Sequence, residues 1–276
     1  MTRFSIVSTM AAAVALMPLL FAPQIRAQQG GADAGATAAE PAPRLADGRP
    51  DLSGVWWTGG DVGGRGFGGG RGQGGRGGRG GAAPPSFTDL YTPAAAEAAT
   101  KLDDDDDPTL RCVPTAFGTL NVSLFDVGAV GQIVATPKFV AMLTETFHGF
   151  RLVPTDGRPH REEVPPSYRG DSVGRWEGDV LVVDTRNFTD DTWIWAEGRA
   201  SPHSDQLRIV ERYRRVDKNT LEIEATLHDP KTLTAPWTIP KQTLVLAPFD
   251  QIMPLICSGL QDSIRDAVPA PGSQQR

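Results

Sequence analysis

The amino-acid sequence predicts a mainly β fold, in which an antiparallel meander closes into a barrel or, as the alternative, forms a β-sandwich. From about residue 130 onward, short segments alternate apolar and polar side chains, as half-buried strands do. Turn-forming Gly, Asp, Asn and Pro residues separate these segments, and few stretches show the 3.6-residue period of a helix. Sequential strands joined by short turns favour antiparallel neighbours.

The expected strands follow one another along the chain. A first strand holds Gly54 and Trp56, and residues 175–179 are interpreted as a strand end followed by a turn. One short helix is expected at 92–102, with Thr92 as N-cap and Pro93 in the first turn. The other strands are expected at 132–136, 139–146, 149–154, 180–184, 207–216, 221–228 and 243–247.

The first 27 residues have the layout of a secretory signal peptide. Arg3 precedes an apolar stretch at 4–22, and Ala27 supplies a small residue before the expected cut. An uncleaved anchor is the alternative, because this stretch is close to the roughly 20 residues that span a bilayer. No cysteine precedes Cys112, which excludes a lipid-modified cysteine at the cleavage site. We expect a periplasmic or secreted protein with no stable membrane insertion after signal cleavage.

Composition divides the rest of the chain into a flexible leader (28–43), a single β domain (44–262) and a flexible tail (263–276). Within the domain, 15 of the 23 residues at 59–81 are glycine, which leaves little side chain to bury, so we expect a disordered insertion. Its arginines resemble the RGG boxes of RNA-binding proteins. The formal charge of −6 opposes that interpretation, and we expect no nucleic-acid partner.

Cys112 and Cys257 are the two cysteines of the chain. In an oxidising compartment such a pair most often forms a disulfide, which we predict here, with a reactive thiol or a metal ligand as the alternative. No two histidines have metal-ligand spacing, so we expect no metal site and no cofactor. The five aspartates at 103–107 lack the spacing of a calcium loop and are interpreted as a solvated acidic loop.

Strand parity selects the candidate site residues. Ile209, Glu211 and Tyr213 share one face of the 207–216 strand, and its apolar members predict that this face points inward. A buried Glu211 needs a partner, so it belongs either to a structural ion pair or to a general acid or base. His203, in the turn before this strand, is the first candidate for proton transfer. His203 and Glu211 are therefore the candidate catalytic pair, and the candidate ligand-binding residues are His148, Tyr213 and Trp193.

Other polar groups receive structural interpretations. His228 shares the parity of Glu222 and Glu224 and is expected to face outward, and His160 is expected in a loop. The acids around Trp176 are either paired carboxylates for hydrolysis or, more simply, a turn in which arginines neutralise them. The tryptophans at 193, 195 and 237 either wall a ligand pocket or belong to the core.

Two resemblances bear on the fold. Gly54 and Trp56 resemble the G-x-W signature of lipocalin and wider calycin barrels, in which the tryptophan plugs the closed end and an arginine packs on it; Arg212 and Arg214 are the candidates here. This implies a lipocalin-like barrel. Residues 44–56 and 170–184, with 229–230 and 236–238, also resemble a family of exported bacterial proteins with no assigned role, which implies a shared fold and supplies no site residues.

The sequence carries no G-x-S-x-G elbow, phosphate loop or dinucleotide fingerprint. The leading function is therefore binding of a small, partly apolar molecule in a barrel cavity. A cofactor-independent lyase or hydrolase that uses His203 and Glu211 is the alternative. A second alternative is an envelope-associated interaction protein whose Gly/Arg-rich segment attaches to anionic surfaces.

Overall fold

The computed structural model describes residues 39–58, 85–117, 130–145, 149–194 and 201–253. The predicted signal peptide, most of the leader, the Gly/Arg-rich insertion and the tail lie outside these residues, as do His148, Trp195 and Cys257.

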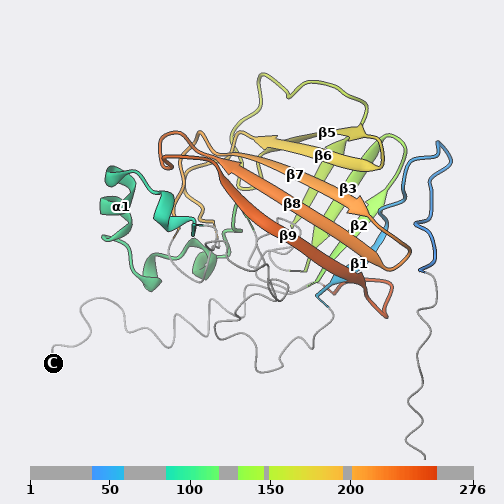
Figure 1. Ribbon diagram of the computed structural model, residues 1–276. Helices are drawn as coiled ribbons and strands as arrows, with labels where there is room; N and C mark the ends of the chain where they lie inside the picture. The colour runs from blue at the N-terminus through green and yellow to red at the C-terminus, as the bar shows by residue number, and fades with distance from the viewer. Residues whose placement is uncertain (1–38, 59–84, 118–129, 146–148, 195–200, 254–276) are drawn as a thin grey trace, which may run out of the picture. The chain divides into compact units, whose positions relative to one another are not determined.

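Nine antiparallel strands form one sheet in the order β4-β3-β2-β1-β9-β8-β7-β6-β5 (Figure 1). Two meanders, β1 to β4 and β5 to β9, are joined where the first strand pairs with the last, Trp56 opposite Leu246. The strands are β1 (Gly54–Trp57), β2 (Val130–Ala135), β3 (Phe139–Thr144), β4 (Phe150–Pro154), β5 (Asp171–Glu177), β6 (Val180–Arg186), β7 (Arg208–Arg215), β8 (Thr220–His228) and β9 (Trp237–Leu246).

The two edge strands, β4 and β5, lie side by side and nearly close the sheet into a barrel. Gly174 of β5 shows how close they come, because a Cβ atom there would lie 2.9 Å from Cγ1 of Val153 in β4. In the described part of the chain no backbone ladder joins these two strands. The predicted mainly β, barrel-like fold is therefore confirmed, with a seam between β4 and β5.

The last strand is longer than the sequence predicts, since it begins at Trp237 and not at residue 243. Pro240 explains the missed strand, because proline cannot donate to a ladder and is expected at edges or bulges. The pairing steps from Ile223–Gln242 to Ala225–Ile239, so that one residue of β8 opposes two of β9. This irregularity accommodates the proline inside the sheet.

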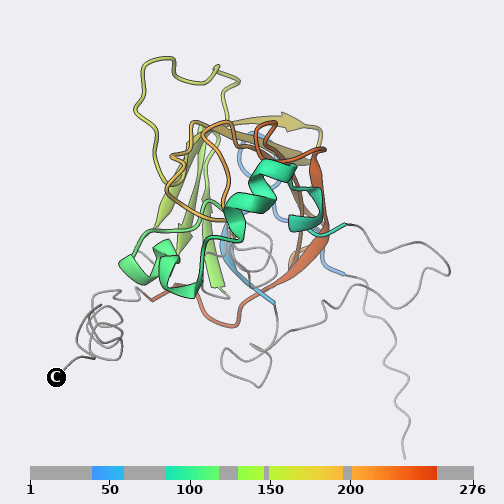
Figure 2. The same ribbon diagram turned by 90° about the vertical axis from the view of Figure 1, so that its left-hand side faces the viewer.

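The predicted helix is present as α1 (Pro93–Ala99), and Thr92 Oγ1 accepts a hydrogen bond from the amide of Ala95 at 3.3 Å. Short 3-10 turns surround it at η1 (Thr88–Leu90), η2 (Asp104–Asp106) and η3 (Pro108–Arg111). Figure 2 shows this segment across one end of the barrel. Within the described residues, no helix has the length and apolar character that a membrane crossing requires.

Two apolar clusters occupy the barrel interior. One surrounds Trp56 and includes Leu221 and Ile223, and the other lies under the helical segment and includes Phe87 and Ile209. Along β7, Glu211 lies between Ile209 of one cluster and Tyr213 of the other. The polar side chain of Glu211 therefore lies between the two apolar clusters of the barrel interior.

Candidate functional site

A buried ion pair lies in the middle of the barrel. Glu211 is fully buried and Arg151 is 6% exposed, and Arg151 Nη1 donates to Glu211 Oε2 at 2.7 Å. The Tyr213 hydroxyl donates to the other carboxylate oxygen at 2.8 Å, and Arg151 Nη2 donates to that hydroxyl at 3.3 Å. The inward direction predicted for Glu211 and Tyr213 is confirmed, and Glu211 has the arginine partner that a buried carboxylate needs.

Arg151 also extends this network toward β5 and β6. Its Nη1 donates to the hydroxyl of Thr185 at 3.2 Å, and that hydroxyl is 2.9 Å from the hydroxyl of Ser172. Burial alone would lower the pKa of Arg151, but the charges and hydrogen bonds of Glu211 and Tyr213 together outweigh it, so the pKa is raised and the guanidinium stays charged. Its Nε atom is buried and has no hydrogen-bond partner among the residues that the structure describes.

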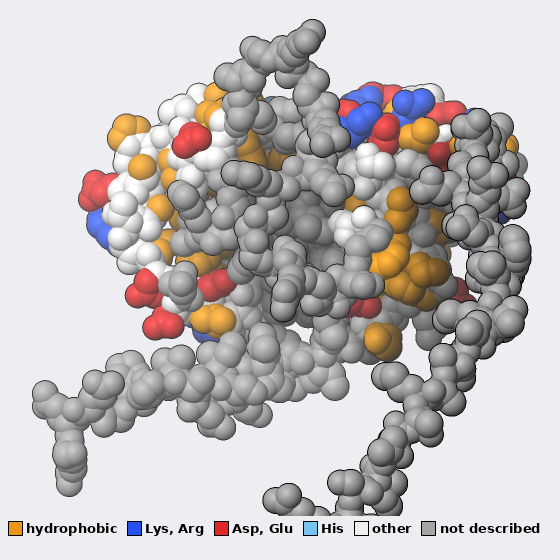
Figure 3. All heavy atoms as spheres, turned by 60° about the horizontal axis from the view of Figure 1, so that its bottom comes forward, with side chains coloured by type: hydrophobic (Ala, Val, Ile, Leu, Met, Phe, Trp, Pro, Cys, Tyr) orange, Lys and Arg blue, Asp and Glu red, His pale blue; other side chains and the backbone are white. Residues whose placement is uncertain are grey.

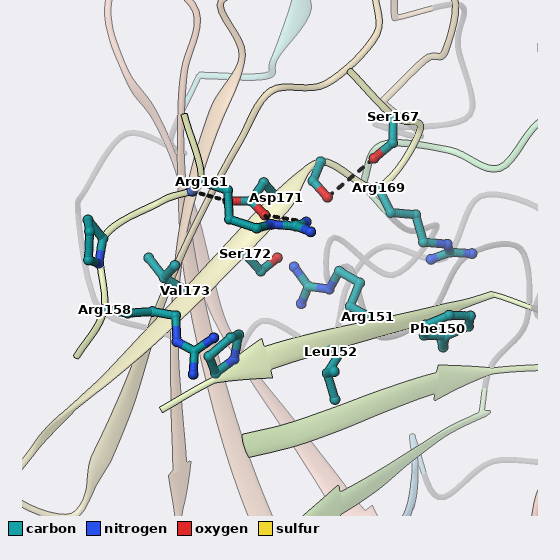
Figure 4. Close-up of a pocket in the computed structure, with 13 residues that line it drawn as sticks. Phe150, Arg151, Leu152, Arg158, Arg161, Ser167, Arg169, Asp171, Ser172 and Val173 are labelled. Carbon is teal, nitrogen blue, oxygen red and sulfur yellow. Dashed lines mark hydrogen bonds and ion pairs between the residues drawn. The ribbon is translucent and has the colours of Figure 1, made fainter. Parts of the chain in front are cut away.

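A pocket of about 420 Å³ opens at the seam between β4 and β5, under the loop at 155–170 that connects them. In Figure 4 the Arg151 guanidinium and the Ser172 hydroxyl approach each other from the two strands. We call this the seam pocket. Its lining includes four arginines and one carboxylate, Arg151, Arg158, Arg161, Arg169 and Asp171, with an apolar wall of Phe150, Leu152, Pro154, Pro159 and Val173.

Asp171 anchors the loop that covers the seam pocket. Arg161 Nε donates to Asp171 Oδ1 at 2.7 Å, and His160 Nδ1 lies 3.1 Å from Asp171 Oδ2. Burial alone would raise the pKa of Asp171, but the hydrogen bonds from Arg161 and His160 outweigh it and the pKa is lowered. Arg158 pairs with the exposed Asp156, and Arg169 donates to the hydroxyl of Thr144 at 3.3 Å.

His203 occupies a different environment from Glu211. Its Nδ1 lies 2.9 Å from the carbonyl oxygen of Ser204 and therefore donates to it, which leaves Nε2 to accept from the Thr192 hydroxyl at 2.8 Å. Burial lowers the pKa of His203 below its ordinary value, so the ring is neutral at neutral pH. Both ring nitrogens thus have partners other than Glu211, and the structure does not bring the predicted catalytic pair into a direct hydrogen bond.

Tyr213 and Trp193, two of the predicted ligand-binding residues, are not among the residues that line the seam pocket. Tyr213 belongs to the buried ion-pair network, and Trp193 is 9% exposed and forms a β-bridge with Pro202, beside His203. His148 lies outside the described residues. Sequence reasoning missed the arginines of the 155–170 loop and the inward-pointing Arg151. The signal for Arg151 was an arginine inside an apolar strand, where only a partner from another strand can satisfy it.

The acids near Trp176 are all neutralised by arginines, as the turn interpretation expects. Glu177 accepts from Arg212 Nη1 at 2.9 Å as well as from Arg175, and Asp179 accepts from Arg44 at 2.8 Å. In the part of the chain that the structure describes, no group of three or more His, Cys, Asp or Glu side chains is placed to hold a metal ion.

The arginine that packs on Trp56 is Arg215, so the expectation of Arg212 or Arg214 is wrong. Arg212 and Arg214 are on the outer face of β7, the first paired with Glu177 and the second 4.0 Å from Glu222. Arg215 shares the inward parity of Tyr213, and this places it over the indole ring. The Trp56 indole donates to the carbonyl oxygen of Leu52 at 3.0 Å.

The described residues hold one of the two cysteines. Cys112 follows η3 with a left-handed backbone conformation, φ 61°, and is half-buried. Cys257 lies outside the described residues, so the pairing of the two stays a prediction.

Comparison with protein-family models, with curated proteins and with solved structures finds no match. The resemblances to the calycin barrels and to exported bacterial proteins therefore stay expectations. The geometry of the seam pocket and of the buried network has to carry the functional conclusion.

Proposed function

We propose that this protein is exported and binds a small anionic molecule with an apolar part in the seam pocket. The observation that carries this proposal is the set of four guanidinium groups against a single carboxylate in the pocket lining. Three of these arginines have a carboxylate partner, since Arg151 pairs with Glu211, Arg158 with Asp156 and Arg161 with Asp171. Even so, the pocket concentrates donors of the kind that hold carboxylates and phosphates in bidentate geometry.

The walls of the pocket support the apolar part of the ligand. Phe150 and Leu152 line it with side chains that are 66% and 53% exposed, and Val173 lies opposite them on β5. The volume of about 420 Å³ lies within the range of roughly 300–1,000 Å³ that small-molecule sites occupy. A ligand with one anionic group and a compact apolar group matches both features.

Binding is better supported than catalysis. The lyase or hydrolase alternative requires His203 and Glu211 to share a site, whereas each has its own hydrogen-bond partners. Glu211, held by Arg151 and Tyr213, is placed to fix the guanidinium that lines the pocket. We assign Glu211 this positioning role.

Export supports the second part of the proposal. The signal-peptide layout at 1–27 predicts an oxidising compartment, and the chain holds only two cysteines. We infer that Cys112 and Cys257 form a disulfide in the exported protein.

Calorimetric titration with phenyl phosphate tests the binding proposal. We expect saturable binding that weakens at least tenfold in an R158Q/R169Q variant, because each lost guanidinium removes a charge-assisted hydrogen bond. The matched control is R175Q/R212Q, whose arginines lie on the outer face of β5 and β7 and should leave the affinity unchanged. Absence of binding, or equal affinity in the two double variants, would overturn the proposal.

A spectroscopic measurement adds a readout at the buried arginine. Nitrogen-resolved NMR of the Arg151 Nε–H group should show a shift on addition of phenyl phosphate, since this buried donor has no partner among the described residues. The Arg215 side chain, at the Trp56 end of the barrel, should not respond. An Arg151 signal that stays unchanged at saturation would place the anion elsewhere.

A further inference from the structure

The outer faces of the barrel strands differ sharply in composition. The outward positions of β2, β3 and β4 carry no charged side chain; they are Val130, which is buried, Gln132, Val134, Phe139, Ala141, Leu143, Phe150, Leu152 and Pro154. The outward positions of β5 to β8 include many charged ones, Arg175, Glu177, Asp184, Arg186, Arg208, Arg212, Arg214, Glu222 and Glu224. On the right of Figure 3, a cluster of blue and red charged side chains lies above an orange apolar patch.

The uncharged positions form one continuous surface, which we call the outer apolar face. The strand register places Ala141 beside both Val134 and Leu152, and Phe139 opposite Pro154. Four of its members are exposed, Phe150 by 66%, Leu152 by 53%, Val134 by 41% and Phe139 by 37%. Contiguous apolar surface of this kind marks an interaction site, because soluble monomers rarely expose it without use.

We propose that the outer apolar face docks the protein on a lipid surface that carries anionic headgroups, with a headgroup phosphate in the seam pocket. The phosphate part rests on the proposed function. The two features belong to one site because Phe150, Leu152 and Pro154 line the seam pocket and also form part of the outer apolar face. A phospholipid has both an acyl region, which would lie against the outer apolar face, and a phosphate, which would lie against the arginines.

Cationic side chains border the outer apolar face. At the end where Phe139 lies opposite Pro154, Lys138 is exposed in the turn between β2 and β3 and its carbonyl oxygen accepts from the Thr155 amide at 3.0 Å. In the same turn, the carbonyl oxygen of Pro137 accepts from Arg49 at 3.3 Å. Arg158 and Arg169 line the pocket beside β4, and Arg169 donates to Thr144 at the other end of β3. Basic side chains around exposed apolar ones suit an anionic lipid surface.

Acids offset part of this charge. Asp156 is paired with Arg158, Asp47 lies 3.6 Å from Arg49, and Glu145, directly after β3, accepts from the amide of Met253 at 3.1 Å. The outer surface of a closed sheet is convex, and a convex apolar face contacts a broad apolar phase better than it encloses a single small ligand. A lipid surface therefore fits the outer apolar face, while the pocket holds one headgroup at its edge.

Vesicle co-sedimentation of the full chain tests the docking. We expect binding to phosphatidylcholine vesicles that contain phosphatidylglycerol and much weaker binding to phosphatidylcholine alone. A V134S/F139S variant, whose two positions lie outside the pocket lining, should lose vesicle binding at least about fivefold. The control is V216S/V245S, whose side chains are 42% and 37% exposed near the turn after β7 and should leave vesicle binding unchanged.

Titration with phenyl phosphate separates the two proposals. V134S/F139S should bind phenyl phosphate as the unmodified chain does, which also shows that the variant is folded. Phenyl phosphate binding without vesicle binding would overturn the docking and leave the pocket proposal standing. If the unmodified chain binds neither phenyl phosphate nor vesicles, both proposals are overturned.

Two other results would also overturn the docking. Equal sedimentation with the two vesicle types would remove the headgroup part of the proposal. Analytical ultracentrifugation that shows a dimer in the unmodified chain and a monomer in V134S/F139S would identify the outer apolar face as a contact between two copies of this chain.

Discussion

The guanidinium of Arg215 lies over the indole ring of Trp56, with Cζ 4.9 Å from the ring centroid. The same guanidinium donates through Nη1 to the carbonyl oxygens of Asp51 and Ser53, at 2.6 and 2.9 Å. β7 and β1 are not neighbours in the sheet, so this contact crosses the barrel interior. It ties the end of β7 to the residues that lead into β1.

Replacing Arg215 with methionine should lower the free energy of unfolding by about 2–4 kcal/mol. The substitution removes a cation–π contact and leaves carbonyl groups in a half-buried environment without their donor. Urea denaturation followed by tryptophan fluorescence measures the change. R214M, at an exposed position one residue away, should stay within about 0.5 kcal/mol of the unmodified protein. Equal effects of the two substitutions would contradict the structural role of Arg215.

The ion pair between Arg151 and Glu211 should show strong coupling. E211L leaves a buried guanidinium without its counter-charge, so we expect a loss of about 3–5 kcal/mol in the free energy of unfolding. The double variant E211L/R151M removes both charges and should be more stable than E211L alone. A double-mutant cycle from chemical denaturation measures this, and additive losses would show that the pair is not coupled.

Stability should depend on pH through His203. Burial lowers the pKa of His203 in the folded protein below its ordinary value of 6.5. Between the lowered pKa and pH 6.5, the unfolded chain binds a proton at His203 that the folded chain does not. The contribution of His203 to the free energy of unfolding is therefore fully present above pH 6.5 and decreases as the pH falls through that range.

Denaturation of the unmodified chain and of H203N between neutral and mildly acidic pH checks this prediction. The substitution should lower stability at neutral pH, because the hydrogen bonds to Thr192 and Ser204 are weakened, and should flatten the pH dependence. Parallel pH curves for the two proteins would show that His203 titrates alike in the folded and unfolded chains.

The predicted disulfide has a direct chemical test. In the exported protein, neither Cys112 nor Cys257 should react with a thiol reagent until a reductant is added. Peptide mapping by mass spectrometry should recover the two cysteines in one cross-linked fragment. C112S/C257S should unfold at a lower urea concentration, since the cross-link limits the unfolded chain. Labelling of both thiols in the folded protein would disprove the pairing.

The sequence predicts the inward face of β7 correctly because Leu207 and Ile209 fix its parity without ambiguity. The same reasoning fails at β4, where apolar residues occupy both faces. There the structure buries Arg151 and exposes Phe150. Glu211, the residue that makes this arrangement favourable, lies 60 positions away on another strand. No local pattern reports that pairing, so the seam pocket could not be predicted from the sequence.

The missing ladder between β4 and β5 has a consequence for how a guest molecule enters. In a fully closed barrel, any widening of the wall breaks rows of amide-to-carbonyl bonds, each of which costs free energy. Here the wall can part along β4 and β5 while every strand keeps its existing ladders, because the Val153 side chain packs on the Gly174 backbone and no ladder joins these two strands among the described residues. Access from outside therefore leaves the backbone ladders intact, and it is resisted by van der Waals contacts and by the side-chain hydrogen bonds that Arg151 of β4 makes to Thr185 and Glu211.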